Sequence, residues 1–387
     1  MPLLSATIRD LEEAMAAGHL AMLIGRYGRS RALRIFRRKL QRLLLLFAGE
    51  VATRQLRTEI GPERLSLQRL RDREQHLGGA YSRTQLARFR HTVDELDEII
   101  AALNPPDDVV LRGEHVIDGE ELVLLLYRRF VSTDSNTHLA DEVGRSEAAI
   151  SEAVRYAVEW LLAKYLHLVD ERGFLMFERH FDAFAAAYTR LGMPVPGMVV
   201  LVDGKLYETC RPVREQDDAY SGHHKSHGAK CLGLTFPNGL LPYATFDPHG
   251  RRHDAHRLAQ SGLLPMLAAV SQRRGTMYRA GADSAFPVHP HCTPMYRGVL
   301  LAGLQRVFNR NYSPVRIQVE WGFGLVVTLF PYMQYRLKLK MLLQPVGLLL
   351  PVAVLLTNIH TCLRGNAISH ACGLSPPSLR DYLAGRV

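Results

Sequence analysis

Apolar and polar positions follow two different patterns along this chain, and the change falls close to residue 190. Before it, apolar residues recur every three or four positions, which is the spacing of amphipathic helices. The segment G-M-P-V-P-G at 192–197 interrupts that pattern, and short apolar runs bounded by turn residues follow it. The pattern predicts an all-α region over residues 1–190 and an α/β region over residues 191–387.

The predicted α/β region opens with a buried strand at 198–202, whose apolar run ends in Asp203 and Gly204. Two further strands, at 230–236 and 241–246, flank the turn P-N-G and are expected to pair as a hairpin. A helix, a short strand and a second helix follow, at 254–270, 277–286 and around 313–329. The order indicates an α/β fold in which the first strands are neighbours.

The all-α region divides at N-P-P-D-D, residues 104–108, which breaks the helical pattern. We expect a basic helical part over 1–110 and a second helical part over 111–190. Within 26–42, eight Lys and Arg residues occur without an acidic one, and apolar residues recur at helical spacing. This predicts a basic amphipathic helix, and its role stays open between a solvated surface, a phosphate contact and a membrane surface.

The second helical part has the outline of a helix-turn-helix unit at 119–165. Three helices can be drawn there, with Gly144 ending the second and Ser146 as N-cap of the third. The residues expected on or near a DNA-facing side are Arg145, Ser146, Glu147, Ser151 and Arg155. Short helical pairs are also common in folds that bind no DNA.

The net charge of the chain limits the kinds of partner that we expect, but it does not indicate the fold. The 387 residues have a formal net charge of +10, and 47% of them are hydrophobic, which suits a globular chain with a core. The positive excess favours a polyanionic partner such as nucleic acid or an acidic membrane. Five cysteines without a C-x-x-C pair suit a reducing compartment, and charged residues near the start argue against a signal peptide.

Residues 341–363 carry no charge and are long enough to span a bilayer. Polar residues and prolines interrupt this run, namely Gln344, Pro345, Pro351, Asn358 and His360. We therefore expect a buried core element and no membrane partner, with a transmembrane segment as the minor alternative.

Three acidic residues stand out by their positions. Asp203 ends the first strand, Asp283 follows the short strand, and Glu320 lies in the last predicted helix. Carboxylates gathered from separate elements repel one another unless a cation joins them, and hard oxygen ligands suit Mg²⁺ or Mn²⁺. Two such ions could support phosphodiester cleavage. On spacing alone, solvated or salt-bridged acids are the more common explanation.

Several ordered blocks resemble the core of Harbinger-type DDE transposases and the nucleases derived from them. The blocks are D-G-K-L-Y-E-T-C-R-P, Y-S-G-H-H-K-S-H-G-A-K, G-R-R-H-D-A-H-R-L-A-Q-S-G-L, G-A-D-S-A-F-P and F-N-R-N-Y-S-P-V-R-I-Q-V-E-W-G-F-G. The resemblance is strongest over 197–331 and weaker over 119–165 and 354–363. It implies a ribonuclease-H-like domain at 191–387, a mixed sheet flanked by helices, in which Asp203, Asp283 and Glu320 are the catalytic metal ligands.

The resemblance also implies a function. We expect a DDE endonuclease or transposase that cuts double-stranded DNA with two Mg²⁺ or Mn²⁺ ions, acts in the nucleus and works as a homo-oligomer. Relatives often need a Myb-like DNA-binding partner. The chain departs from the family at His223, where a lysine is usual, and at 325–327, where a basic residue often follows. The alternative is an inactive, transposase-derived protein that still binds DNA.

Other side chains near these blocks have competing interpretations. Lys225, His224, Lys230, Asn309 and Arg316 could hold DNA, although solvated side chains or a helix cap would explain them as well. His253 and Asp254 could support the metal site, or Asp254 could sit in the first turn of a helix.

Three further interpretations are weighed less favourably. Zinc could bind one of two histidine sets, 223, 224 and 227 or 249, 253 and 256, but no cysteine pair supports it. Trp321 and Phe323 are expected to pack in the core rather than to stack on DNA bases. Cys292 has no neighbouring base that would make it a nucleophile.

Overall fold

The structure, a computed structural model, describes residues 64–77, 79–112, 115–212, 216–247, 253–298, 300–334 and 346–387. The basic helix predicted at 26–42 lies outside these residues. By their contacts, residues 64–387 form one unit, and the boundaries predicted at 110 and 190 fall inside it. The division into domains therefore stays a prediction.

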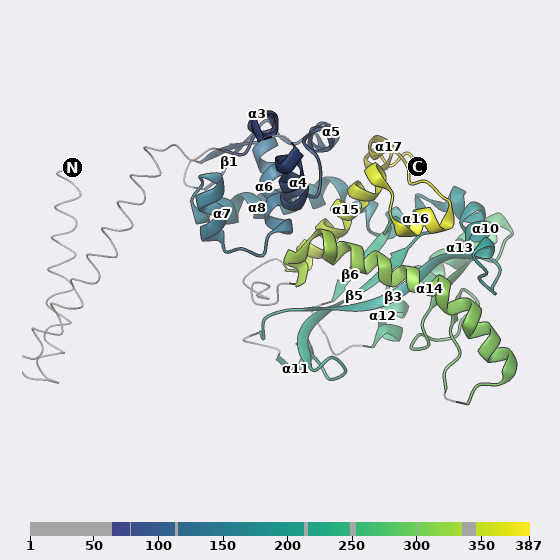
Figure 1. Ribbon diagram of the computed structural model, residues 1–387. Helices are drawn as coiled ribbons and strands as arrows, with labels where there is room; N and C mark the ends of the chain where they lie inside the picture. Colours follow the sequence, from purple (N-terminus) through teal and green to yellow (C-terminus); the bar gives the residue numbers. More distant parts are fainter. Residues whose placement is uncertain are drawn as a thin grey trace, which may run out of the picture. The chain divides into compact units, whose positions relative to one another are not determined.

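Helices make up the part of the unit that precedes the sheet (Figure 1). They are α3 (Leu67–Leu77), α4 (Gly79–Phe89), α5 (Val93–Leu103), α6 (Gly119–Val131), α7 (Asn136–Val143), α8 (Glu147–Tyr165), α9 (Glu171–Leu175) and α10 (Phe181–Arg190). A short hairpin, β1 (Asp108–Val110) with β2 (Val116–Asp118), was not predicted. The Thr92 side chain and Glu95 form a capping box that starts α5, and the left-handed Asn104 ends it.

The helices predicted at 119–165 are α6, α7 and α8. Gly144, with a φ of 67°, ends α7, since glycine adopts this left-handed conformation without strain. The Ser146 side chain caps α8 by accepting a hydrogen bond from the backbone of Ala149. The helix positions therefore match the prediction, whereas a DNA-binding role for them stays a prediction.

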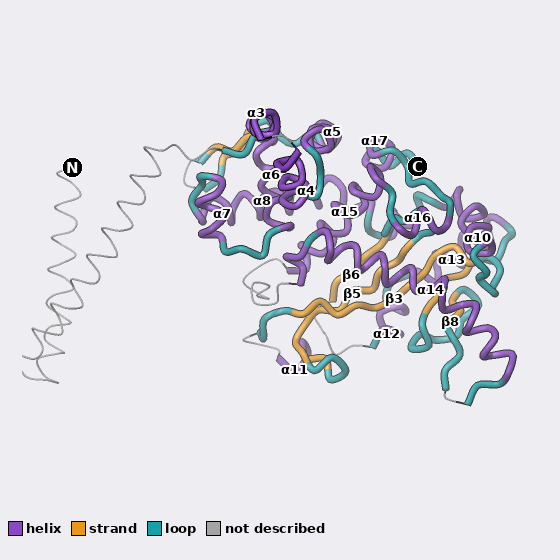
Figure 2. Tube along the Cα trace, in the orientation of Figure 1, coloured by secondary structure: helices purple, strands orange, loops and turns teal. Residues whose placement is uncertain are grey.

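A mixed sheet lies in the C-terminal half (Figure 2). Its strands are β3 (Met198–Glu208), β4 (Tyr220–Ser221), β5 (Ser226–Thr235), β6 (Tyr243–Asp247), β7 (Arg279–Ala282) and β8 (Cys292–Pro294). β3 is central, antiparallel to β5 and parallel to β7, while β6 pairs with β5 and β8 with β7. This sheet, flanked by helices, fits a DDE nuclease fold.

The central strand β3 is longer than its apolar run. Met198–Val202 is fully buried, as predicted. The strand continues to Glu208 because its polar half pairs with β5, where Asp203 lies opposite Gly233 and Glu208 opposite Gly228. Pairing with a neighbouring strand thus extends an element that hydropathy alone would end at residue 202.

Helices approach β3 and β5 closely from opposite faces of the sheet. A methyl group on Gly233 would meet the ring of Phe323, in α14 (Gly303–Leu329), at 2.4 Å. On Gly204 it would meet the carboxylate of Asp254, in α12 (Asp254–Gln260), also at 2.4 Å. Gly233 pairs with Asp203, so Asp203 faces α14, whereas Gly204 faces α12 because successive strand residues alternate. The helix predicted at 254–270 is divided at Gly262 into α12 and α13 (Leu263–Arg274).

The last apolar segment forms α15 (Val346–Arg364), followed by α16 (Ala367–Cys372) and α17 (Leu379–Leu383). In the described part of the chain, Gly347–Arg364 is long and apolar enough to cross a membrane, and 67% of it is buried inside the protein. Asn358 is fully buried and bonds both backbone polar groups of Leu241 at 2.9 Å. The segment is therefore a core helix, as its polar interruptions predict.

Candidate functional site

Asp203 and Asp283 lie at the C-terminal ends of two neighbouring strands. β3 and β7 are parallel, and Leu201 pairs with Gly281. Two residues further along each strand, the register brings the two aspartates to the same edge of the sheet. Backbone N–H groups hold both carboxylates, from Gly204 to Asp203 at 2.9 Å and from Ala285 to Asp283 at 2.8 Å. Parallel pairing thus joins residues that are eighty positions apart.

The hydroxyl of Tyr312 fixes the strand end that carries Asp283. Tyr312 comes from α14 and is fully buried. Its hydroxyl accepts a hydrogen bond from the backbone N–H of Ala282 at 2.8 Å and donates one to the carbonyl of Thr293 at 2.5 Å. One side chain therefore ties α14 to β7 and β8 immediately before the second aspartate.

Glu320 approaches Asp203 from α14, which packs against β3 (Figure 1). An arginine lies between the two carboxylates. Arg316 forms an ion pair with Glu320 one helical turn away, and its Nη1 atom is 3.7 Å from Oδ2 of Asp203. The Arg316 side chain is 13% exposed and that of Glu320 50%. The cation beside Asp203 in this structure is therefore a guanidinium.

Burial and negative neighbours change the acidity of Asp203. Burial raises the pKa of its carboxyl to about 6, while Arg316 and the Gly204 N–H act to lower it and Asp283 and Glu320 act to raise it. The two other acids are thus close enough to Asp203 to affect its charge. Near pH 6 and below, Asp203 holds a proton for a large part of the time.

The fit of these acids to a divalent ion is partial. Carboxylates are suitable ligands for Mg²⁺ or Mn²⁺, and Asp203 and Asp283 lie at neighbouring strand ends, where no basic group of the described residues comes closer than 3.7 Å. Glu320 is held by Arg316, and over the described residues no group of three or more His, Cys, Asp or Glu could hold a metal ion. The aspartate pair fits a metal, whereas Glu320 is paired with Arg316 and does not form a three-residue metal-binding group with the aspartates among the described residues.

Lys205 is a site residue that the sequence did not single out. It lies two residues after Asp203 on β3 and therefore on the same face of the sheet. Its Nζ atom is 5.6 Å from the centre of the Tyr207 ring and 6.0 Å from that of Phe323. Burial lowers the pKa of its ammonium group. The spacing of two along a strand was the available signal.

The histidine and the lysines predicted to hold DNA lie in the turn before β5 and in β5 itself. His224 and Lys225 are exposed in the turn that precedes β5, and Lys225 has a left-handed φ of 52°. Lys230 instead bonds Asp254 at 3.1 Å, and this pair lies on the α12 face, opposite Asp203. Asp254 begins α12 and His253 precedes it as an exposed N-cap, so the first-turn interpretation describes Asp254.

Two residues predicted near Glu320 have structural surroundings of their own. The Asn309 side chain bonds both the N–H and the carbonyl of Tyr296 at 3.0 Å, which fixes the loop before α14. Phe323 is 3% exposed, as expected for core packing. Trp321 is 42% exposed, so the prediction that it packs in the core is wrong. The reason is its place on the outer side of α14, two positions from Phe323.

The predicted DNA-facing residues of α8 differ in availability. Arg145, in the turn between α7 and α8, is paired twice with Glu121, whose side chain is 1% exposed, so this arginine joins the turn to α6. Ser146 is engaged as the α8 cap. Ser151 and Arg155 are exposed. An outward contact with DNA is therefore open to the last two, while Arg145 already has a partner inside the protein.

The zinc and thiol alternatives gain no support in the described residues. Neither His223, His224 and His227 nor the pair His253 and His256 belongs to a metal-binding group there, and His249 lies outside the described residues. Cys292 is buried, and burial raises the pKa of its thiol to about 12. A thiol with so little thiolate is a poor nucleophile.

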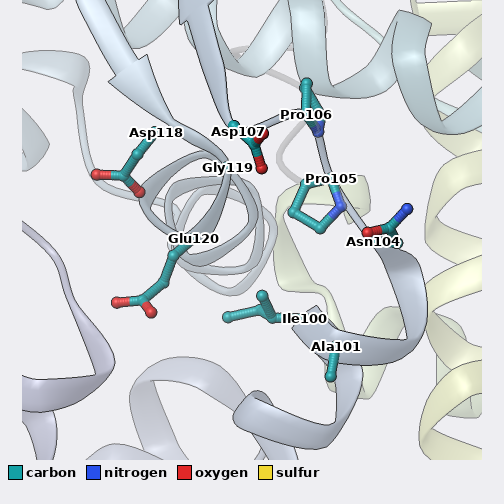
Figure 3. Close-up of a pocket in the computed structure, with 9 residues that line it drawn as sticks. All are labelled: Ile100, Ala101, Asn104, Pro105, Pro106, Asp107, Asp118, Gly119 and Glu120. Carbon is teal, nitrogen blue, oxygen red and sulfur yellow. The ribbon is translucent and has the colours of Figure 1, made fainter.

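A pocket of about 490 Å³ lies away from the acidic site, between the end of α5 and the start of α6 (Figure 3). Its lining includes Asp107, Asp118 and Glu120. Asp118 caps α6, and Glu120 accepts a hydrogen bond from the backbone of Leu67 at 2.7 Å. Two of its carboxylates are therefore used by the fold itself.

Comparison with known proteins gives one match. Residues 202–358 match the family described as DDE superfamily endonuclease, and this segment contains Asp203, Asp283 and Glu320. No curated protein and no solved structure matched the chain. The match supports the DDE superfamily for this segment, and members of that superfamily generally use divalent metals on DNA. It does not distinguish a Harbinger type.

Proposed function

We propose that this chain is a metal-dependent DNA endonuclease or transposase of the Harbinger type, acting by a two-metal DDE mechanism. The observation that carries the proposal is the position of Asp203 and Asp283 at adjacent ends of parallel strands. Glu320 approaches the same pair from α14 and influences the pKa of Asp203. These three residues would hold two Mg²⁺ or Mn²⁺ ions.

The chain's own residues prepare the site in separate ways. Tyr312 holds the strand end that presents Asp283. Asp203 must be deprotonated to act as a ligand, so binding improves as the pH rises through about 6. Arg316 must give up Glu320 before that carboxylate can serve. When bound, the metal ions supply activation of the attacking water and neutralisation of charge on the leaving oxygen.

The proposal extends to the partners of the site. Double-stranded DNA is the substrate that a DDE endonuclease segment implies, and the net charge of +10 favours such a polyanion. His224 and Lys225 are exposed beside β5, and Ser151 and Arg155 on α8, where they could contact the backbone. We further propose that the chain forms a homo-oligomer that holds two DNA ends. It would have a Myb-like partner and act in the nucleus.

A second candidate function is supported by the ion pair at Glu320. If Arg316 keeps Glu320 permanently, the metal site stays incomplete and the chain would bind DNA without cutting it. This is the inactive, transposase-derived DNA-binding protein. Both functions predict DNA affinity, and only the first predicts cleavage.

A nicking assay separates the two functions. Purified protein with Mg²⁺ or Mn²⁺ should nick supercoiled DNA, and Asp283→Asn should abolish nicking while DNA affinity is retained. Asp94→Asn is the matched control, since Asp94 is exposed in the first turn of α5 and no described residue pairs with it. DNA binding without nicking by the wild type would favour the second function. Equal nicking by wild type and Asp283→Asn would refute the proposed site.

A further inference from the structure

Lys205 is a cation beside the acidic residues, and the described part of the chain gives it no ion-pair partner. It shares the α14 face of β3 with Asp203, and its side chain is partly buried next to Tyr207 and Phe323. Considering the described residues alone, no carboxylate forms a salt bridge with Lys205 and no group hydrogen-bonds its Nζ atom. Asp203 attracts the ammonium electrostatically without being in contact with it.

Lys230 is a useful comparison for Lys205, because it is a lysine of the same sheet that does have an ion-pair partner. It lies on the neighbouring strand β5, but on the opposite face, and its Nζ atom is 3.1 Å from Asp254. The fold has thus supplied a carboxylate to the lysine on the α12 face and none to the lysine on the α14 face. A partly buried cation without an anion is unfavourable, so a ligand that brings an anion would be stabilised there.

A second cation, Arg316, lies beside Asp203. Nη1 of Arg316 is buried, lacks a hydrogen-bond partner within the described part of the chain, and is 3.7 Å from Asp203. Arg316 and Phe323 both belong to α14, and Phe323 packs against Gly233, the β5 residue that pairs with Asp203. Because Lys205 lies by Phe323, both cations are on the α14 face of the sheet together with Asp203.

We propose that Lys205 binds a non-bridging oxygen of the DNA phosphodiester that enters this site, next to the bond to be cut. An ammonium group is a compact point charge that suits a phosphate oxygen without selecting a base, so the contact would be independent of sequence. The rings of Tyr207 and Phe323 lie beside its ammonium group, on the face of the sheet that carries Asp203. The inference rests on the proposed function, because it takes DNA as the substrate of this site.

The test uses full-length protein and a short DNA duplex, with three variants. Lys205→Met removes the charge at nearly constant volume, and Lys205→Arg restores a positive charge. Lys164→Met is the matched control: Lys164, in the last turn of α8, hydrogen-bonds the backbone carbonyls of Leu103 and Asn104 and, like Lys205, lies near two aromatic rings, but far along the chain from the acidic residues. DNA affinity is measured with EDTA over a series of salt concentrations, and single-turnover cleavage with Mn²⁺.

Lys205→Met should weaken DNA binding about 10-fold at low salt and reduce the slope of log affinity against log salt by about 1. It should also slow single-turnover cleavage about 10- to 100-fold at saturating DNA, because the contact lies at the reacting phosphate. Lys205→Arg should recover most of both effects, and Lys164→Met should match the wild type. A merely structural role for Lys205 would leave the salt slope unchanged.

An unchanged salt slope and unchanged affinity in Lys205→Met would overturn the inference. If the wild type binds DNA without cutting it, the endonuclease function fails, and the salt slope still decides whether Lys205 contacts a phosphate. If the wild type does not bind DNA, both the function and the inference are refuted.

Discussion

Replacing Asp203 by asparagine should stabilise the metal-free protein at neutral pH. Burial and two neighbouring acids raise the pKa of this carboxyl from 3.8 to about 6. A pKa difference of about 2 corresponds to about 3 kcal/mol by which the charged carboxylate destabilises the folded state. Asparagine removes the charge and keeps an oxygen that can accept the Gly204 N–H. For a unit of this size, about 3 kcal/mol corresponds to a rise in Tm of about 4 °C.

The sign of the pH dependence follows from the raised pKa. The stability that protonated Asp203 contributes is fully present below pH 3.8 and is lost as the pH rises through about 6. The gain from Asp203→Asn should therefore be small near pH 4 and reach its full size above pH 7.

Thermal unfolding by circular dichroism in EDTA, at pH 4.5 and pH 7.5, measures this gain, with Asp94→Asn as the control. Adding Mn²⁺ at pH 7.5 should raise the Tm of the wild type more than that of Asp203→Asn. A destabilised Asp203→Asn at pH 7.5, or a gain of the same size at both pH values, would refute the reasoning.

Three further variants test individual contacts inside the fold, one near the α7–α8 turn and two beside the acidic site. Glu121→Gln should lose about 3 kcal/mol or more of stability by urea unfolding, because Arg145 would keep a partly buried charge without its partner; a loss below 1 kcal/mol would contradict this. Tyr312→Phe should cost about 1–3 kcal/mol and slow cleavage with little change in DNA affinity, since a buried N–H on β7 loses its acceptor; unchanged stability would speak against the anchor. Gly233→Ala should reduce both stability and cleavage, because the added methyl group meets the Phe323 ring at 2.4 Å; wild-type behaviour in both assays would show that the contact can relax.

Hydropathy and turn residues located most of the sheet in advance. The apolar run of β3, the β5–β6 hairpin and the short strand β7 lie where the sequence predicts them. The polar half of β3 was missed because β5 supplies its hydrogen bonds, and a hydropathy pattern does not show which strand will pair with it. The first ten residues of α14 were missed as well, and that part of the helix contains the exposed residues Leu304 and Val307. An outward-facing helix turn lacks the apolar periodicity on which such a prediction depends.

The site was predictable as a set of residues but not as a set of contacts. Spacing and family resemblance singled out Asp203, Asp283 and Glu320, and the parallel register of β3 with β7 brings the first two together. Which cation neutralises them depends on the side of α14 that faces the sheet, and the sequence alone does not give that rotation. Lys230 was also predicted to act at the site, although its position on β5 places it on the α12 face of the sheet, opposite Asp203.

The most direct test of the metal site is the anomalous scattering of Mn²⁺ in crystals of the protein. We expect manganese beside the carboxylates of Asp203 and Asp283, with Glu320 released from Arg316 to join them, and no manganese at this place in Asp203→Asn crystals. Crystals at saturating Mn²⁺ in which Arg316 still holds Glu320 and no metal lies beside the aspartates would contradict it.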